Sequence, residues 1–548
     1  MRVKNSARRP RNPLLLRTPD ELEDDVRKFY DRNHLQDVID VELLIKGARI
    51  AQEPDNLYTL DLTPAEFKAI KDEKESGFWQ QSKDLKVTIL TTACAAITQG
   101  WQQSTINAGS GGWKHDLQPK GEDWTHDHLL LAGFIDAAPW LSGSIICSIL
   151  CTFLLVYLWI FLPSDSNTYQ YSGVFVGFAC DWIVNRQWRV LLGTASIPAL
   201  ILLFLVFLCP ESPRFLIRRG DYIGAYVSLR QLRGTDIQAA RDLYYIHSQL
   251  QVETEMFDGE RPQNWYNQEI YQERVRETGF LKRLVILFSH PRNQRACVAA
   301  FLVMASQQLC GINVLSFYSS RLFNGATTQD KIPDTSDSRQ PANVTWLNFG
   351  FGLANFLFTI PAYRYIDWRG RRLLLLISLA GMFLSLLAIG FFFRIEANTV
   401  RLALVSTFAI GFFTFFYGIG AGPVPFTFSA EVFPLAFREV GMSFSVMVNF
   451  LGLGLLVLLV PKLTEAWGKY GESNLCFLFM GLNALAFVLV FLFVPSGTAK
   501  VGLEEMNQIF NTKMSVHIKE HVVSLGSLCG QRKLEDEPHN LQQFNDHA

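Results

Sequence analysis

The residues that could do chemistry in this chain are three amides, Gln307, Gln308 and Asn313, within an otherwise apolar run from Ala296 to Phe317. Polar groups at membrane depth are costly, and they usually face a cavity or mark the path of a solute. An amide carries no charge and offers both hydrogen-bond donors and an acceptor. These residues therefore suit a neutral, hydroxyl-rich solute better than an ion. The alternative is that they join helices to one another within the membrane.

The spacing of these amides requires a change in backbone direction. In an unbroken helix of 3.6 residues per turn, Gln308 and Asn313 would point about 140° apart and could not easily contact one small solute. Gly311 lies between them and permits a break, because glycine lacks a Cβ atom. We therefore predict a helix break at Gly311, or a solute that spans the groove between the amides.

The composition indicates the kind of structure that must hold the amides. The chain has 548 residues, of which 49% are hydrophobic and only 18% are charged. Apolar runs recur at about 20 residues, the length that crosses a bilayer as a helix. These runs are continuous rather than alternating, which excludes a closed barrel and predicts an all-α polytopic membrane protein.

Other functional classes find no support in the residues. No nucleophile–base pair, phosphate-binding loop or metal-ligand cluster is present, so we expect no enzyme activity, no metal and no cofactor. The formal net charge is -1 and there is no basic aromatic tract, so no nucleic-acid partner is expected. The expected partners are a small-molecule solute and the lipid bilayer.

The apolar runs divide into two sets separated by a polar stretch from 210 to 295. One run, Leu129–Leu162, is too long for one span and too short for two with a turn. The predicted spans are about Lys86–Asn107, His128–Leu162, Tyr171–Asn185 and Val190–Cys209, then those near 296–320, 347–366, 373–393, 402–426, 440–462 and 475–494.

Several motifs together resemble the sugar porter family of the major facilitator superfamily. They are Pro210–Arg214, Gln307–Asn313, Asp367 through Arg372, and Gly422–Phe426 continuing to Glu431 and Arg438. The resemblance implies two helix bundles around a central solute site, which opens alternately to the two sides of the membrane. The implied solute is a hexose or a related polyol.

The resemblance also implies which side chains contact the sugar. In the family, amides at the positions of Gln307, Gln308 and Asn313 contact sugar hydroxyls, and Asn355 and Asn449 also fall on contact positions. Phe426 takes a place where the family often has tryptophan. Its ring can still pack against a pyranose, but the indole donor is absent.

Charged residues near the span ends match the inner gate of the family. The gate would consist of Glu211, Arg214, Asp367, Arg371, Arg372, Glu431 and Arg438. The alternative is that these charges are solvated and mark only the cytoplasmic side. Gly422, Pro423 and Pro425 predict a bend in the tenth helix of the family, which could serve as a gate or as a static kink.

The first half of the chain departs from the family. The family pattern is lost near Ser148 and regained near Tyr171, so helices three, four and the start of five are missing. The predicted fold is therefore a major facilitator-type two-bundle fold with about ten transmembrane helices, four plus six, instead of twelve. An inactive or truncated remnant from an altered transcript, or a non-transporting sugar sensor, remains an alternative to a carrier.

Another departure concerns the first helix. Proton-coupled members of the family carry an acid where this chain has Gln102, which cannot exchange a proton. A carrier with this sequence is therefore expected to be facilitative.

Basic residues near the span ends predict the topology, because cytoplasmic loops are enriched in Lys and Arg. We expect an integral protein of the plasma membrane with both termini cytoplasmic. The predicted divisions are an N-terminal tail at 1–84, an incomplete bundle at 85–209, a central cytoplasmic loop at 210–295, a six-helix bundle at 296–494 and a C-terminal tail at 495–548.

Overall fold

The computed structural model describes most of the chain as helices. The described residues are 13–54, 56, 58, 60–75, 80–116, 126–150, 166–184, 187–258, 280–327, 342–434, 437–495 and 510. Within these ranges there are helices and turns but no strands. The predicted all-α fold is confirmed.

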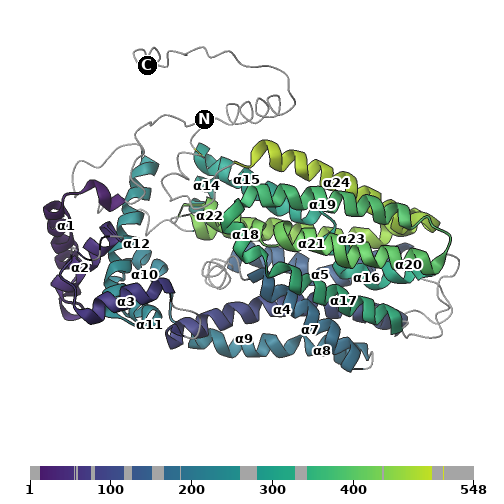
Figure 1. Ribbon diagram of the computed structural model, residues 1–548, viewed down its shortest axis with the longest axis horizontal. Helices are drawn as coiled ribbons and strands as arrows, with labels where there is room; N and C mark the ends of the chain where they lie inside the picture. The colour runs from purple at the N-terminus through teal and green to yellow at the C-terminus, as the bar shows by residue number, and fades with distance from the viewer. Residues whose placement is uncertain are drawn as a thin grey trace, which may run out of the picture.

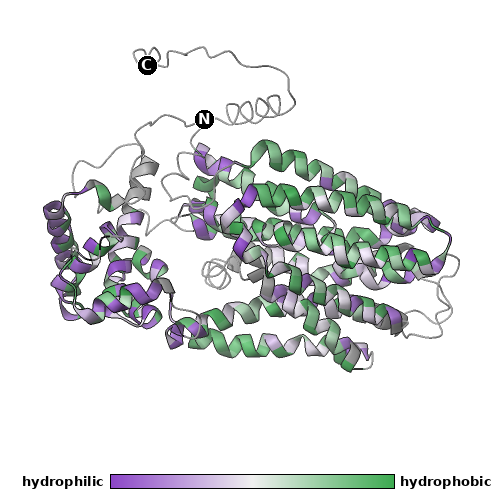
Figure 2. Ribbon diagram, in the orientation of Figure 1, coloured by the Kyte–Doolittle hydropathy of each residue, from purple (hydrophilic) through white to green (hydrophobic). Residues whose placement is uncertain are grey.

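Two regions of different polarity are visible along the long axis of the molecule (Figure 1). Long helices run side by side over most of its length, and short helices gather at one end. The long helices are predominantly apolar and the short ones carry most of the polar residues (Figure 2). We name the helices at this end the polar helical domain; they are α1 (Pro19–Arg32), α2 (Val41–Gln52), α3 (Pro64–Glu75), α10 (Pro213–Arg219), α11 (Tyr222–Arg233) and the longer α12 (Asp236–Asp258).

The first half of the chain contributes few long helices. They are α4 (Lys83–Asp116), α5 (His126–Leu150), α7 (Ser166–Ile183), and α8 (Trp188–Thr194) followed directly by α9 (Ser196–Leu208). Helix α4 packs along α7 and α9, α5 packs along α23, and α7 packs along α17. The first half is therefore joined to the second through the pairs α5–α23 and α7–α17. Helix α4 also contacts the second half, at α16 (Ile312–Thr327).

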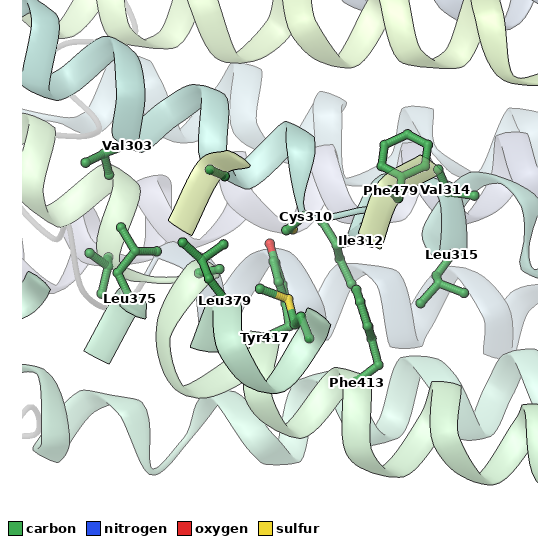
Figure 3. Packing of buried hydrophobic residues seen from close by; sticks show 14 of the residues in the cluster. Val303, Cys310, Ile312, Val314, Leu315, Leu375, Leu379, Phe413, Tyr417 and Phe479 are labelled. Atoms are coloured by element: carbon green, nitrogen blue, oxygen red, sulfur yellow. The ribbon is translucent and has the colours of Figure 1, made fainter. Parts of the chain in front are cut away.

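The second half is built from more helices around one apolar core. They are α15 (Pro291–Leu309), α16 (Ile312–Thr327), α17 (Ala342–Thr359), α18 (Ala362–Arg369), α19 (Arg371–Phe392), α20 (Asn398–Thr407), η5 (Phe408–Phe413), α21 (Thr414–Phe416), η6 (Tyr417–Ala421), α22 (Val424–Val432), α23 (Arg438–Ala466) and α24 (Gly471–Phe493). Helix α14 (Phe280–Ser289) leads into this set. Figure 3 shows part of the core, where Tyr417 lies among apolar side chains that include Cys310 and Leu379.

Some of these helices have the length and hydropathy of membrane spans. In the described part of the chain 6 qualify: Trp188–Leu208, Pro291–Ala326, Arg371–Phe392, Asn398–Val432, Arg438–Ala466 and Gly468–Phe493. The predicted number of about ten spans stays a prediction. Of the ambiguous run Leu129–Leu162, helix α5 accounts for residues up to Leu150, and residues 151–165 lie outside the described part.

The polar helical domain has a core of its own. A capping box begins α1, because the Glu21 amide donates to Thr18 Oγ1 (3.3 Å) and the Thr18 amide donates to Glu21 Oε2 (2.9 Å). The apolar face of α1 then packs on α12, where Leu243 and Tyr244 are fully buried. A second capping box, of Thr63 and Glu66, is present at the start of α3.

This core joins segments that the sequence divided between an N-terminal tail and a central loop. Arg241 of α12 donates to both carboxylate oxygens of Glu73 in α3, at 2.7 and 3.0 Å. Burial alone would raise the pKa of Glu73, but the hydrogen bond and charge of Arg241 outweigh it and the net shift is downward. Ser82 Oγ, just before α4, donates to the Leu232 carbonyl at 2.6 Å. The domain is thus attached directly to the start of α4.

A buried histidine makes the stability of this domain sensitive to pH. His247 is enclosed beside Phe29, and its Nδ1 lies 3.0 Å from the Tyr222 hydroxyl. Burial lowers the pKa of His247 from 6.5 to about 4. Between these values the unfolded chain binds a proton that the folded domain does not, so stability is full above about pH 6.5 and falls as pH decreases toward 4. We expect a loss of about 2 kcal/mol between pH 7 and pH 5.

Hydrogen–deuterium exchange of α1 and α12 in the full chain, corrected for intrinsic rates, measures this loss. His247→Phe should abolish most of the pH dependence. His34→Asn, at an exposed histidine, should preserve it. Equal protection of both helices at pH 7 and pH 5 in the wild type would contradict the prediction.

Candidate functional site

The helix that carries the amides is broken as predicted. Helix α15 ends at Leu309, Gly311 adopts a φ of +89°, and α16 begins at Ile312. The break brings Asn313 back toward α15, so that its Nδ2 donates to Gln308 Oε1 at 2.5 Å. The break at Gly311 therefore allows the contact between Gln308 and Asn313 that an unbroken helix would prevent.

Replacing Gly311 with alanine should destabilise the protein. A Cβ atom would lie 3.3 Å from Phe479 Cβ, and the positive φ is unfavourable for any residue with a side chain. The backbone term costs about 1–2 kcal/mol. A lowered midpoint of thermal unfolding in detergent is the expected result. Gly481→Ala, in a helix where the added Cβ meets nothing within 4 Å, is the matched control. Equal unfolding midpoints for the two variants would contradict the strain at Gly311.

A third amide, from the first half of the chain, joins the Gln308–Asn313 pair. Gln103 of α4 donates through Nε2 to Asn313 Oδ1 at 3.2 Å, and both side chains are buried. We name Gln103, Gln308 and Asn313 the first amide group. Gln103 was not among the predicted site residues, although its polarity within the apolar part of α4 was a usable signal.

Gln307 belongs to a second amide group with Asn449 and Tyr417. Its Oε1 accepts from Asn449 Nδ2 at 2.6 Å. Its Nε2 lies 3.3 Å from the Tyr417 hydroxyl and 3.2 Å from the carbonyls of Ala421 and Gly422, so two hydrogens are shared among three acceptors. The Tyr171 hydroxyl of α7 donates to the Tyr417 hydroxyl. The sequence interpretation missed both tyrosines, because their pairing joins residues far apart in the chain.

The remaining predicted sugar contacts are Asn355, which makes no printed hydrogen bond with either amide group, and Phe426, which lies beside the second group. Asn355 is fully buried in α17; its Nδ2 donates to the Phe351 carbonyl at 3.2 Å, and its Oδ1 has no hydrogen-bond partner in the described structure. An unsatisfied buried acceptor costs about 1–3 kcal/mol. Phe426 packs in a small apolar cluster with Met304 and Val446. Met304 also contacts Asn449, at 3.6 Å from Sδ to Nδ2, so the cluster adjoins the second amide group.

A seam of hydrogen bonds continues from the amides toward the end opposite the polar helical domain. Asn107, one turn beyond Gln103 in α4, donates to the Ser316 carbonyl (2.8 Å) and to Ser319 Oγ (2.7 Å) of α16. Ser319 Oγ donates in turn to Asn348 Oδ1 of α17, also at 2.7 Å. The two halves of the chain are therefore in direct polar contact on this side of the amides.

Part of the predicted charged gate is assembled at the other end. Arg371, at the start of α19, donates through Nε and Nη2 to the two oxygens of Glu431 in α22, at 3.0 and 2.8 Å. Arg372 turns to α24, where its Nη2 donates to the Phe491 carbonyl at 2.6 Å. A bidentate pair of this kind has a fixed geometry as well as charge.

The other predicted gate residues are not part of the Arg371–Glu431 ion pair. Glu211 is exposed, and its carbonyl accepts from Ser228 Oγ. Arg214 is the second residue of α10, and Arg438 begins α23. Asp367 lies in α18, and its side chain is outside the described part of the structure.

Two further charged contacts at this end were not predicted. Arg283 of α14 lies 3.8 Å from Glu439 of α23. Arg292 of α15 donates to the Val432 carbonyl at the end of α22, at 3.2 Å. Both contacts join helices of the second half.

The helix that carries Tyr417 and Phe426 is interrupted where a bend was predicted. Wide turns of the π type occur at Phe408–Phe413 and at Tyr417–Ala421, and the Gly422 amide donates to the Tyr417 carbonyl at 2.9 Å. Regular helix resumes at Val424, after Pro423. The two carbonyls that Gln307 contacts, those of Ala421 and Gly422, lie at this interruption, and a regular helix could not have used the Ala421 carbonyl because Pro425 has no N–H.

The arrangement of helices is similar to that of two solved structures. The structure of the proton:xylose symporter XylE bound to 6-bromo-6-deoxy-D-glucose superposes with a TM-score of 0.58 at 17% identity, covering 78% of this chain and 99% of that one. A partially occluded inward open form of XylE from E. coli gives 0.55 at 16% identity, covering 76% and 98%. At these identities the likeness shows the fold alone.

Sequence comparison identifies the family. The family described as "Sugar (and other) transporter" matches residues 143–510. "Probable polyol transporter 6" of Arabidopsis thaliana is 29% identical over 360 residues, which cover 62% of this chain and 66% of the relative. Facilitated glucose transporter member 2 of solute carrier family 2 from Bos taurus is 27% identical, covering 53% and 50%. The chain belongs to the sugar transporter family, whose members are integral membrane transporters and not enzymes.

The chain matches only part of the length of its relatives. The chain spans 66% of the length of the plant polyol transporter, slightly less than two thirds. The first half supplies fewer long helices than the second among the described residues, and the family match begins at residue 143, within α5.

Proposed function

We propose that this protein carries a neutral, hydroxyl-rich solute, a hexose or a related polyol, across a membrane by alternating access. The observation that carries the proposal is the set of buried amides from both halves of the chain, Gln103, Gln307, Gln308, Asn313 and Asn449. Amides pair with hydroxyls as donor and acceptor at once, and uncharged groups give no advantage to an ion. The names of the relatives, which are polyol and glucose transporters, support the same solute class.

The hydrogen bonds within the amide groups describe a site without solute. Each amide is satisfied mainly by another amide or by a tyrosine, so a solute must exchange these bonds for its own hydroxyls. Asn355 Oδ1, which has no partner in the described structure, offers an acceptor without such an exchange. We propose Gln307, Gln308, Asn313, Asn355 and Asn449 as the polar contacts and Phe426 as the apolar one.

The charged contacts near the polar helical domain are proposed as the inner gate. Arg371 and Glu431 form its centre, with Glu211, Arg214, Asp367, Arg372 and Arg438 around it. Ion pairs at an interface can bias two conformations of nearly equal free energy, which is what a carrier needs. We propose that this end and both termini face the cytoplasm and that the membrane is the plasma membrane, with the domain divisions given above.

The mode of transport is proposed to be facilitative, because Gln102 in α4 stands where proton-coupled members carry an acid. Purified full-length protein in liposomes should take up labelled D-glucose, D-xylose or sorbitol until inside and outside concentrations are equal. No uptake above protein-free liposomes for any of the three would overturn the carrier. Accumulation that collapses with a protonophore would overturn the facilitative mode.

A further inference from the structure

A buried indole lies where the two halves of the chain meet, and its N–H has no hydrogen-bond partner. Trp140 of α5 is 4% exposed, and its Nε1 donates to no acceptor in the described structure. A buried tryptophan N–H usually finds a partner, because a buried donor without one is destabilising. The exceptions in a native structure call for an explanation, such as a group that the bare chain does not contain.

Two neighbours of Trp140 belong to helices that carry the first amide group. The indole meets Phe317 of α16 edge to face, with ring centroids 5.7 Å apart, and Phe317 lies about one helical turn beyond Asn313. Ile106 of α4 packs against the same apolar cluster as the indole, about one turn beyond Gln103. Trp140 therefore borders the first amide group on the side away from the polar helical domain.

Helix α23 connects Trp140 to the remaining member of the first amide group, Gln308. Phe450 of α23 meets the indole with ring centroids 5.8 Å apart, and Leu453 belongs to the same buried cluster. Between these two residues lies Gly452, where an added Cβ atom would be 2.9 Å from Gln308 Cγ. The Gln308 side chain thus lies against the stretch of α23 that also packs on the indole.

We propose that Trp140 is a solute-binding residue, whose indole N–H donates to a hydroxyl of the sugar or polyol held at the first amide group. This inference rests on the proposed function and adds a contact from α5 to it. The indole N–H is a donor only, so it needs an acceptor. A hydroxyl can accept from the indole and at the same time donate to an amide oxygen, whereas an ammonium ion offers no acceptor.

The indole differs from the amides in what binding costs. Each member of the first amide group already has a hydrogen bond with another member, which a solute must replace. The Trp140 N–H has no such bond to lose, so a solute hydroxyl placed against it gains a hydrogen bond without breaking one. A site that bonds a hydroxyl rejects the analogue that lacks it. Trp140 should therefore make the site selective for a hydroxyl at one position of the solute.

Trp140→Phe removes the N–H and keeps an aromatic ring. Binding of labelled D-glucose and sorbitol to the purified full-length protein should weaken by about 5- to 20-fold. Trp101→Phe is the matched control, because Trp101 Nε1 donates to Thr194 Oγ1 at 3.1 Å, within the first half of the chain. Its affinity should stay within about twofold of the wild type.

Mono-deoxy analogues of D-glucose separate a hydrogen bond from a packing effect. At one position, loss of the hydroxyl should weaken binding to the wild type by about 5- to 20-fold and binding to Trp140→Phe by less than about twofold. At the other positions the two losses should be additive. Benzothienylalanine incorporated at position 140 replaces the N–H by sulfur and keeps the shape of the ring, so it provides the same comparison if Trp140→Phe does not fold.

The outcomes distinguish this inference from the function on which it rests. If the wild type binds a solute, then wild-type affinity in the altered protein, or additive losses at every position, would overturn the role of Trp140 and leave the carrier in place. If the wild type binds none of the solutes, the proposed function fails and the Trp140 contact fails with it.

Discussion

Replacing Gln307 with leucine should lower solute affinity by about 10- to 100-fold. The substitution conserves the approximate volume of the side chain but removes the donor and the acceptor that Gln307 offers to solute hydroxyls in the proposed site, and it takes the Oε1 acceptor from Asn449 Nδ2. Each buried polar group left unsatisfied costs about 1–3 kcal/mol, and a tenfold change in affinity corresponds to about 1.4 kcal/mol. Equilibrium binding of labelled D-glucose and sorbitol to the purified protein measures the change.

Gln294→Leu is the matched control for this experiment. Gln294 lies in the first turn of the same helix, α15, and its Nε2 donates to the Phe288 carbonyl at 2.6 Å, away from both amide groups. Its affinity should equal that of the wild type. Wild-type affinity in Gln307→Leu would remove Gln307 from the proposed site, and equal losses in both variants would point to a general effect on folding.

Neutralising Glu431 should be the most destabilising change at the charged end. Its partner Arg371 is 6% exposed, so Glu431→Gln leaves a guanidinium buried without its counter-charge. Removing one member of a buried ion pair costs about 3–5 kcal/mol. Because the Glu431 side chain is itself 31% exposed, solvent screening should bring the loss to the lower end of that range. The thermal unfolding midpoint of the purified protein should fall accordingly.

Two further variants separate the pair from the individual residues. Arg369→Gln removes an exposed arginine at the end of the neighbouring helix α18 and should leave the midpoint unchanged. The exchange Arg371→Glu with Glu431→Arg should recover part of the loss, because it restores one charge of each sign. A midpoint for Glu431→Gln equal to that of Arg369→Gln would show that the pair contributes nothing to stability.

Local rules predicted the features whose cause lies within a few residues. Gly311 was identified because its neighbours Gln308 and Asn313 could not meet in a regular helix, and the break is present. The interruption near Gly422 followed from the helix-breaking residues beside it. In each case the determining groups are adjacent in sequence.

Features that depend on distant partners could not be predicted in the same way. The Tyr171–Tyr417 bond and the Gln103–Asn313 bond join α7 and α4 to the second half. Nothing near Tyr171 distinguishes it from a tyrosine that packs against lipid. The amphipathic α1 (Pro19–Arg32) was assigned to a polar tail. The helix whose apolar side chains it meets, α12, begins only at Asp236, far along the sequence. The assignment of Arg372 to the gate followed from the family motif, whereas its bond to the Phe491 carbonyl depends on how α19 packs on α24.

The core of the polar helical domain has a consequence for biosynthesis. Its apolar surface is shared between residues near the N-terminus, such as Leu22 and Phe29, and residues of α12, such as Leu243. Ribosomes add about 5–20 residues per second, so α1 waits roughly 10–40 s for its partner to be synthesised. During this interval α4 through α9 are made, among them the candidate span Trp188–Leu208, while the apolar faces of α1 and α2 that α12 will cover are exposed. A chaperone or the bilayer surface must shield these helices until translation passes residue 258.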